Sequence, residues 1–203
     1  MNENANAPDR LEDLAKNREK VIVRTSVLGI VANVFLAAMK AVIGLFAHSI
    51  AVILDAVNNL TDVLSSVITV IGTKLAGKKP DKKHPFGHGR IEYFTEMIIG
   101  ILILYAGITA LVESVKKIIT PEPADHSAVT IVILAAAIVV KLLLGLYVRK
   151  KGKEVNSGSL KASGTDALFD AILTVSVLVS AGLYLLFKIN IEAYVGILIS
   201  AFI

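Results

Sequence analysis

Residues 49–72 read SIAVILDAVNNLTDVLSSVITVIG, an apolar run long enough to cross a lipid bilayer. Four carboxylate and amide side chains interrupt this run: Asp55, Asn58, Asn59 and Asp62. Because each residue of a helix turns by about 100°, all four fall on one narrow face. Charge in lipid is expensive, so this polar stripe should face the interior of a helix bundle or an aqueous cavity.

The composition of the whole chain supports a membrane location for this run. Of the 203 residues, 55% are hydrophobic, and the mean hydropathy of +0.70 is above that of an ordinary soluble domain. We therefore predict an all-α membrane protein with a bundle of six transmembrane helices. The spans are expected at residues 21–47, 49–75, 91–119, 127–148, 160–187 and 191–203.

Basic residues gather in alternate connections between these spans. The polar N-terminal segment 1–20 is predicted to be a cytoplasmic lead-in, either amphipathic or disordered, and it lacks the apolar core of a signal peptide. KKPDKKH (78–84) follows the second span, and RKKGKE (149–154) follows the fourth. The positive-inside rule makes all three segments cytoplasmic. The net charge of +4 thus reflects topology and requires no nucleic-acid partner, for which interleaved aromatic residues are missing.

A second pair of acidic residues lies in the fifth span. Asp166 and Asp170 are four residues apart and share one helix face. Together with Asn58 and Asp62 they would provide four side-chain oxygen donors, and a divalent cation would offset their repulsion and desolvation. The alternatives are neutral carboxyl groups hydrogen-bonded between helices, a proton relay and, more weakly, hydrolysis by paired carboxylates.

The loop after the second span contains a further group of potential ligands. Asp81, His84 and His88 could bind one metal ion through a carboxylate oxygen and two imidazoles. The alternative is a basic loop with solvated histidines. The chain has no cysteine, which excludes thiolate metal sites and disulfides. We expect no resident cofactor.

Three segments taken together resemble the signature regions of the cation diffusion facilitator family. They are HSIAVILDAVNNLTD (48–62), DKKHPFGHGRIE (81–92) and TDALFD (165–170), and the resemblance runs in order from about residue 21 to residue 203. It implies a homodimeric, multi-pass transporter of the cell membrane, not an enzyme, that exports divalent transition metals, usually in exchange for protons. Family members usually continue into a cytoplasmic ferredoxin-like domain. This chain is still apolar at residue 203, so we expect a truncated sequence without that domain.

The resemblance also implies roles for individual residues. It assigns a transport site to Asn58, Asp62, Asp166 and Asp170, with Asp55 as a support one turn away. Zinc-transporting members typically have histidine at the position of Asp166, so the set in this chain is similar to the manganese-transporting branch. The donor chemistry agrees, because oxygen ligands suit Mn²⁺ better than Zn²⁺ and Mg²⁺ gives up its water reluctantly.

The loop residues Asp81, His84 and His88 match a second, cytoplasm-facing metal site of some members. The expected partners are thus a divalent metal ion, protons, membrane lipid and a second copy of the chain. The alternatives to a manganese exporter are a Zn²⁺, Fe²⁺ or Cd²⁺ exporter of the same family, a membrane metal sensor or scaffold that does not transport, and, more weakly, an ion channel.

Several smaller features bear on how the helices pack. Lys40 and Lys141 lie in apolar runs and could snorkel, pair with an acid or line a cavity; snorkelling is favoured for Lys141. The segment SGSLKASG (157–164) is expected to be a flexible lead into the fifth span. Close helix contacts are expected at small residues of the third and sixth spans, namely Gly100, Gly107, Gly196 and Ser200.

Overall fold

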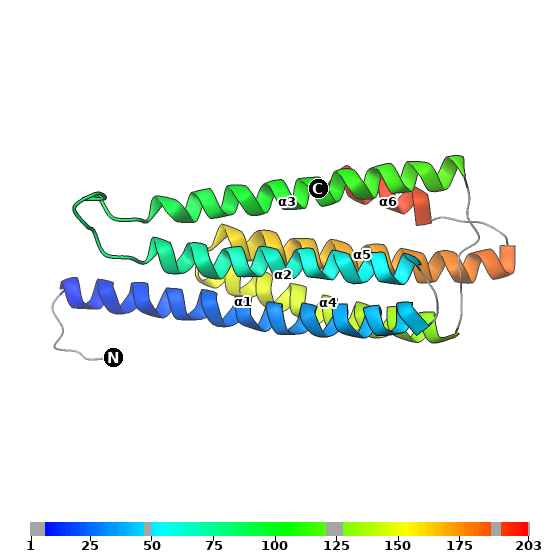
Figure 1. Cartoon of the computed structure of the whole chain (residues 1–203), viewed down its shortest axis with the longest axis horizontal. Coiled ribbons are helices and arrows are strands. Elements are labelled where there is room, and N and C mark those ends of the chain that lie inside the picture. The colour runs from blue at the N-terminus through cyan, green and yellow to red at the C-terminus, as the bar shows by residue number, and fades with distance from the viewer. Residues whose placement is uncertain (1–6, 47–49, 121–127, 188–191, 203) are drawn as a thin grey trace.

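The computed structural model describes residues 7–46, 50–120, 128–187 and 192–202, and over these ranges the chain is a bundle of helices (Figure 1). No strand occurs in the described ranges, which confirms the predicted all-α class. The helices are α1 (Ala7–Phe46), α2 (Ile50–Ala76), α3 (Arg90–Ile119), α4 (Ala128–Glu154), α5 (Gly158–Phe187) and α6 (Glu192–Ser200).

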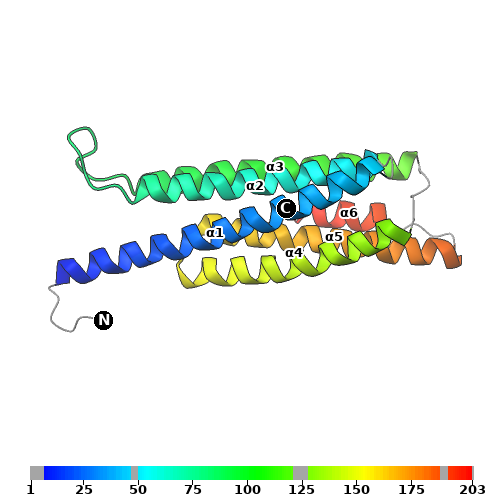
Figure 2. The ribbon, with the colours of Figure 1, turned by 60° about the horizontal axis from the view of Figure 1, so that its bottom comes forward.

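The helices pack mainly in neighbouring pairs. α1 lies along α2, and α4 lies along α5, while α3 contacts α2, α5 and α6. Figure 2 shows α2 and α3 above α4 and α5, with α1 crossing between the two layers. Contacts of α1 with α4 and of α2 with α5 join the layers into one bundle.

Four helical segments are long and apolar enough to cross a membrane: Asp9–Phe46, Arg90–Ile119, Ile131–Glu154 and Gly158–Ser180. α2 is not among these four segments. α6 covers only nine residues. α2 nevertheless packs against α1, α3 and α5 as a member of the bundle. The predicted span limits at 47, 49, 127, 191 and 203 lie outside the described residues.

The third span agrees with α3 to within one residue at each end, but α1 is longer than predicted. It begins at Ala7, so residues 7–20 of the polar lead-in are helical. This segment is rich in good helix formers. Glu12 and Lys16, one turn apart, also form an ion pair of 3.0 Å between Oε1 and Nζ.

The connection between α4 and α5 differs most from the sequence prediction. The basic segment 149–154 is the last part of α4 instead of a loop, and most of the segment 157–164 belongs to α5 instead of a flexible lead. Lysine and arginine are good helix formers, so a basic segment can continue a helix that has already begun. The chain reverses at Asn156, whose φ is 47°, and the Ser157 hydroxyl accepts a long hydrogen bond of 3.5 Å from the N–H of Leu160 at the start of α5.

The three basic segments lie at one end of the bundle. The start of α1, the loop 77–89 and the α4–α5 turn all appear on the left of Figure 1. This is the arrangement that the charge pattern predicts for a cytoplasmic face.

An ion-pair network closes this basic end. The Arg18 guanidinium donates two hydrogen bonds to the Glu92 carboxylate, of 3.0 Å from Nη1 and 2.5 Å from Nη2. Its Nε donates to the Val155 carbonyl at 2.8 Å. The Glu96 carboxylate accepts a hydrogen bond of 2.7 Å from the N–H of Gly158. These contacts tie α1 and α3 to the α4–α5 turn.

Glycines allow α4 and α5 to approach each other closely. A Cβ atom at Gly164 would lie 2.5 Å from the backbone nitrogen of Arg149, and one at Gly145 would lie 3.0 Å from the carbonyl oxygen of Gly164. Backbone atoms cannot move aside as a flexible side chain can. A side chain at either glycine would therefore push the two helices apart.

The close contact predicted between α3 and α6 is found at one of the glycines, Gly196. Gly107 is buried on α3, and a Cβ at Gly196 would collide with the hydroxyl of Ser114. The prediction is wrong for Gly100, where a Cβ would meet no atom within 4 Å.

We expect Gly164→Ala to destabilise the bundle by about 1–3 kcal/mol, because its methyl group would press on the backbone of α4. Thermal unfolding in detergent micelles, followed by circular dichroism, should show a lower Tm. Gly100→Ala is the matched control: it adds the same methyl group to a helix in open space, so its Tm should be unchanged or slightly higher. Equal Tm values for the two variants would contradict the packing argument.

Candidate metal centre

All four residues predicted to form a transport site line one small cavity between α2, α3 and α5. α2 contributes Asn58 and Asp62, and α5 contributes Asp166 and Asp170. Each pair has the spacing of one helical turn, so both of its members reach the same side of their helix. The rest of the lining is mostly small or apolar: Thr61, Ser65, Leu102, Ile103 and Ala106. The cavity therefore gathers three carboxylates and one amide, the donor set expected from the sequence.

The other two residues of the α2 stripe do not line this cavity. The Asp55 carboxylate forms an ion pair with Lys40 of α1, with 2.7 Å between Oδ2 and Nζ. Of the options for Lys40, the structure shows pairing with an acid. Asn59 is fully buried, and its side-chain amide has no hydrogen-bond partner among the described residues. The role of Asp55 in supporting the site stays a prediction.

Lys141 of α4 lies among the cavity carboxylates. Its Nζ is 2.5 Å from Oδ2 of Asp170 and also donates to Oδ2 of Asp62. The prediction that Lys141 snorkels is wrong. The residue is in the middle of α4, about 20 Å from either end, which is beyond the reach of its side chain. Charged residues in the middle of a span are usually paired, so the mid-span position of Lys141 was the available signal for the pairing seen here.

A second cavity adjoins the first and extends toward the basic end of the bundle. It lies between α1, α2, α4 and α5 and shares Asp62 and Asp166 with the first cavity. Thr69 and Ser163 in its lining are closer than these aspartates to the loop 77–89 and to the α4–α5 turn. We call it the hydroxyl cavity, because its polar lining is mainly the hydroxyl groups of Thr25, Ser26, Ser65, Ser66, Thr69 and Ser163, with the amide of Asn33 beside them.

Several oxygen atoms in the hydroxyl cavity are unpaired. Within the described part of the chain, Ser26 Oγ, Asn33 Oδ1 and Ser163 Oγ are buried without a hydrogen-bond partner. Buried polar atoms are normally satisfied, so unpaired ones beside a polar cavity mark places where water or a cation can bind. Sequence reasoning did not find this cavity. The adjacent hydroxyl residues at 25–26 and 65–66 were the available signal.

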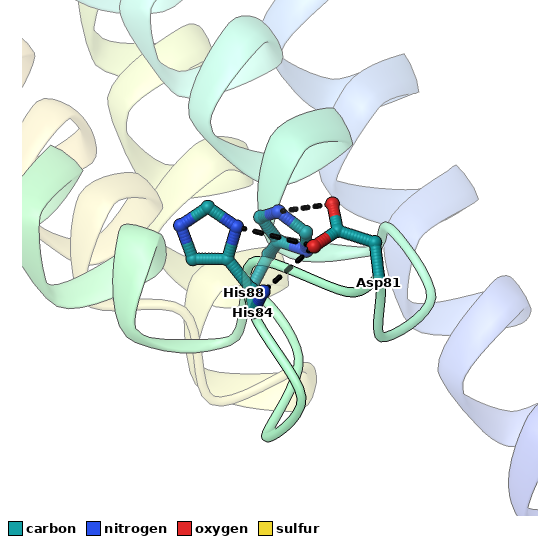
Figure 3. Close-up of side chains that lie close together, drawn as sticks. All are labelled: Asp81, His84 and His88. Atoms are coloured by element: carbon teal, nitrogen blue, oxygen red, sulfur yellow. Dashed lines mark hydrogen bonds and ion pairs between the residues drawn. The ribbon is translucent and has the colours of Figure 1, made fainter.

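The predicted loop residues also come together. Figure 3 shows the imidazoles of His84 and His88 beside the Asp81 carboxylate, in the loop between α2 and α3. Their possible ligand atoms all lie within 4.8 Å of one another. His84 Nδ1 is 3.4 Å from Oδ1 of Asp81, and His88 Nε2 is 3.7 Å from Oδ2. Two imidazoles and one carboxylate are ligands that zinc and similar transition metals accept.

Backbone hydrogen bonds hold the Asp81 side chain in place. Its Oδ1 accepts hydrogen bonds from the N–H groups of His84 at 2.7 Å and Lys83 at 2.8 Å. The hydrogen bond from His84 is the main reason that the pKa of the Asp81 carboxyl lies below its usual value. Oδ2 does not take part in these two bonds, so it stays available to a ligand.

The sequence of this chain is similar to a known protein family and to several known proteins. A family model described as the cation efflux transmembrane domain matches residues 26–203. The chain is 36% identical over 180 residues to an uncharacterized transporter of Methanocaldococcus jannaschii, covering 87% of this chain and 62% of that protein. It is 29% identical over 195 residues to the manganese efflux system protein MneS of Bacillus subtilis, covering 94% and 66%.

A third relative is the magnetosome protein MamM of Paramagnetospirillum magneticum, which is 32% identical over 139 residues, covering 66% of this chain and 42% of that protein. The chain thus spans two thirds or less of the length of these curated relatives. The matched family model confirms the resemblance on which the site residues were assigned.

We expect Asp81→Ala to loosen the loop, because the N–H of Lys83 loses its side-chain acceptor and that of His84 keeps only a 3.2 Å hydrogen bond to the Asp81 carbonyl. Hydrogen exchange measured by mass spectrometry should show several-fold faster exchange at these two amides. Asp81→Asn, which keeps a side-chain oxygen, should retain most of the protection. Equal exchange in Asp81→Ala and the wild-type chain would contradict this role.

The same protection should depend on pH in one direction. The folded carboxyl of Asp81 has a lowered pKa, so its contribution is present above the ordinary carboxyl pKa of about 3.9. It is lost as the pH falls through the lower folded value. Loss of protection already between pH 7 and pH 5 would contradict this assignment.

Proposed function

The chain belongs to the cation efflux family, whose transmembrane domain matches residues 26–203, and from this premise we propose that it exports a divalent transition-metal ion from the cytoplasm, with Mn²⁺ as the preferred ion. It is a multi-pass membrane protein, and we place it in the cell membrane with the basic end of the bundle inside. The proposal rests chiefly on one observation: Asn58, Asp62, Asp166 and Asp170 line a single cavity within the bundle.

The choice of Mn²⁺ follows from the donors. The four proposed ligands offer three carboxylates and one amide and no imidazole or sulfur atom. Such hard oxygen donors suit Mn²⁺ better than Zn²⁺. Mg²⁺ is disfavoured because it gives up its water reluctantly in a site that is mostly protein. The relative MneS is named a manganese efflux system protein, which supports the same choice.

The route to the site is supported by the second cavity. We propose that the metal ion approaches from the basic end through the hydroxyl cavity, whose unpaired oxygens can replace part of its hydration shell. It then binds at Asp62 and Asp166, which the two cavities share, together with Asn58 and Asp170. A movement of the helices exposes the ion to the other side of the membrane.

Protons are the proposed counter-ion. Carboxylates bind either a metal ion or a proton, so protonation outside the cell would help to release the metal. Asn58 cannot take up a proton near neutral pH, which limits the exchange to the aspartates. The proposed assembly is a homodimer, as the family resemblance implies. The proposed activity is secondary transport and not catalysis.

The loop residues Asp81, His84 and His88 are proposed as a second metal site on the cytoplasmic side. The clustering of their ligand atoms within 4.8 Å supports this. His88 Nδ1 is buried and has no hydrogen-bond partner in the described ranges, so this nitrogen is available as a ligand atom.

Asp62→Ala and Asp170→Ala should each reduce Mn²⁺ transport at least about tenfold, because each removes a charged ligand. The measurement is Mn²⁺ uptake into proteoliposomes that contain a metal-sensitive dye. Glu113→Gln is the matched control: it removes a carboxylate from an exposed position on α3 and should transport like the wild type. Full transport by either aspartate variant, with normal membrane insertion, would refute the assigned site.

Asp166→His should shift the preference of the transporter from Mn²⁺ toward Zn²⁺, because it introduces an imidazole among the oxygen donors. The same dye assay, run with Mn²⁺, Zn²⁺, Fe²⁺ and Cd²⁺ in parallel, measures the ratio of the rates. A variant that moves Mn²⁺ normally and gains no Zn²⁺ transport would show that position 166 does not set selectivity. A wild-type chain that prefers Zn²⁺ would overturn the argument from donor chemistry.

A further inference from the structure

We propose that Lys141 is a tethered counter-cation: its ammonium occupies the transport site when the site is empty, and an arriving metal ion displaces it. This inference rests on the proposed function, because it assigns Lys141 a part in metal binding at the same cavity. The observation behind it is the contact of one buried ammonium with two of the proposed ligands, Asp62 and Asp170.

The ammonium and a metal ion compete for the same oxygen atoms. Lys141 Nζ lies 2.5 Å from Oδ2 of Asp170 and also donates to Oδ2 of Asp62. A divalent ion bound to these oxygens would sit about 2.0–2.6 Å from them. Its charge would then be only a few ångströms from the ammonium, in surroundings that screen charge poorly. The two cations cannot hold these positions together, so the ammonium has to move when metal binds.

The structure offers a place for the displaced ammonium. Leu144, one turn from Lys141 on α4, lines the hydroxyl cavity. The unpaired oxygens in that cavity, Ser26 Oγ, Asn33 Oδ1 and Ser163 Oγ, can accept hydrogen bonds from an ammonium. The flexible four-carbon stem of a lysine allows its ammonium to change position while the helix stays in place.

Two consequences distinguish this role from a purely structural ion pair. A tethered competitor weakens the apparent affinity for metal, since only the fraction of sites free of it can bind. It also stabilises the empty site against the repulsion of its own carboxylates. Removal of the ammonium should therefore tighten metal binding and destabilise the metal-free protein at the same time.

Lys40 provides a matched control within the same bundle. Lys40 and Lys141 are each only 3% exposed, and each pairs with an aspartate of α2, Lys40 with Asp55 at 2.7 Å. Lys40 and its partner Asp55 line neither the ligand cavity nor the hydroxyl cavity, whereas both partners of Lys141, Asp62 and Asp170, line the ligand cavity. Removal of Lys40 should cost stability but change metal binding much less than removal of Lys141.

The test compares the wild-type chain, Lys141→Gln and Lys40→Gln in lipid nanodiscs at pH 8. Mn²⁺ binding is measured by calorimetry, and Tm is measured with and without Mn²⁺. Lys141→Gln should lower the metal-free Tm, increase the rise in Tm caused by Mn²⁺, and lower the apparent Kd about tenfold or more. Lys40→Gln should lower Tm but change the Kd and the Mn²⁺-induced rise in Tm much less than Lys141→Gln does.

Transport adds a second readout. In proteoliposomes, Lys141→Gln should lower both KM and kcat. KM falls because the metal ion no longer has to displace the ammonium. kcat falls because the metal-free site, without the ammonium to offset its carboxylates, returns more slowly across the membrane. A Kd for Lys141→Gln equal to or weaker than that of the wild type would overturn the proposal. If this variant does not fold, Lys141→Arg keeps the charge with a stiffer, bidentate group and should bind Mn²⁺ more weakly than the wild type. Binding as tight as in the wild type would again refute it.

The experiments distinguish a failure of the proposed function from a failure of the role proposed for Lys141. A wild-type chain that neither binds nor moves a divalent metal contradicts the proposed function itself. A wild-type chain that transports Mn²⁺, with Lys141→Gln behaving like Lys40→Gln, contradicts only the role of Lys141.

Discussion

Carboxylates held inside an apolar bundle lose their hydration and repel one another, so they need positive charge beside them. Among the described residues the bundle meets this requirement twice, each time with an aspartate of α2 and a lysine from another helix. Lys141 of α4 pairs with Asp62, and Lys40 of α1 pairs with Asp55. Only the first pair adjoins a cavity with further carboxylates. The Lys40–Asp55 pair is therefore only a contact between helices, whereas the Lys141–Asp62 pair is also part of a ligand site.

Close packing of α4 and α5 brings this charge pairing within reach. Gly145 lies one turn from Lys141, and a Cβ at Gly145 would press on Leu168 and on the backbone of α5. Without side chains at the contact, the two helices approach closely enough for a lysine of one to reach Asp170 of the other. The helix contact and the ligand geometry are thus linked: a residue that separates the helices also withdraws the ammonium from the site.

The helices and the ligand pair within each of α2 and α5 could be predicted from the sequence, because both follow from periodicity within one helix, whereas the joining of the two pairs into one site was implied by the family resemblance. Asn58 with Asp62 and Asp166 with Asp170 share a face at their spacing, and both pairs line one cavity in the structure. The predictions failed where the answer depends on contacts between helices. The basic segment 149–154 is helical because neighbouring helices support it, and the partners of Lys141 lie on two other helices. The hydroxyl cavity likewise arises only when four helices meet.

The lysine among the carboxylates also bears on which ions the site can neutralise. With the three aspartates ionised, Asp62, Asp166, Asp170 and Lys141 have a formal charge of −2. One divalent cation brings this sum to zero while the lysine stays charged nearby. A single sodium or potassium ion leaves one negative charge uncompensated in a medium where that is costly. The cluster would then select by valence, independently of the hardness or spacing of its donors. The positive charge of Lys141 beside Asp62 and Asp170 thus sets the charge that an occupant of the site must carry.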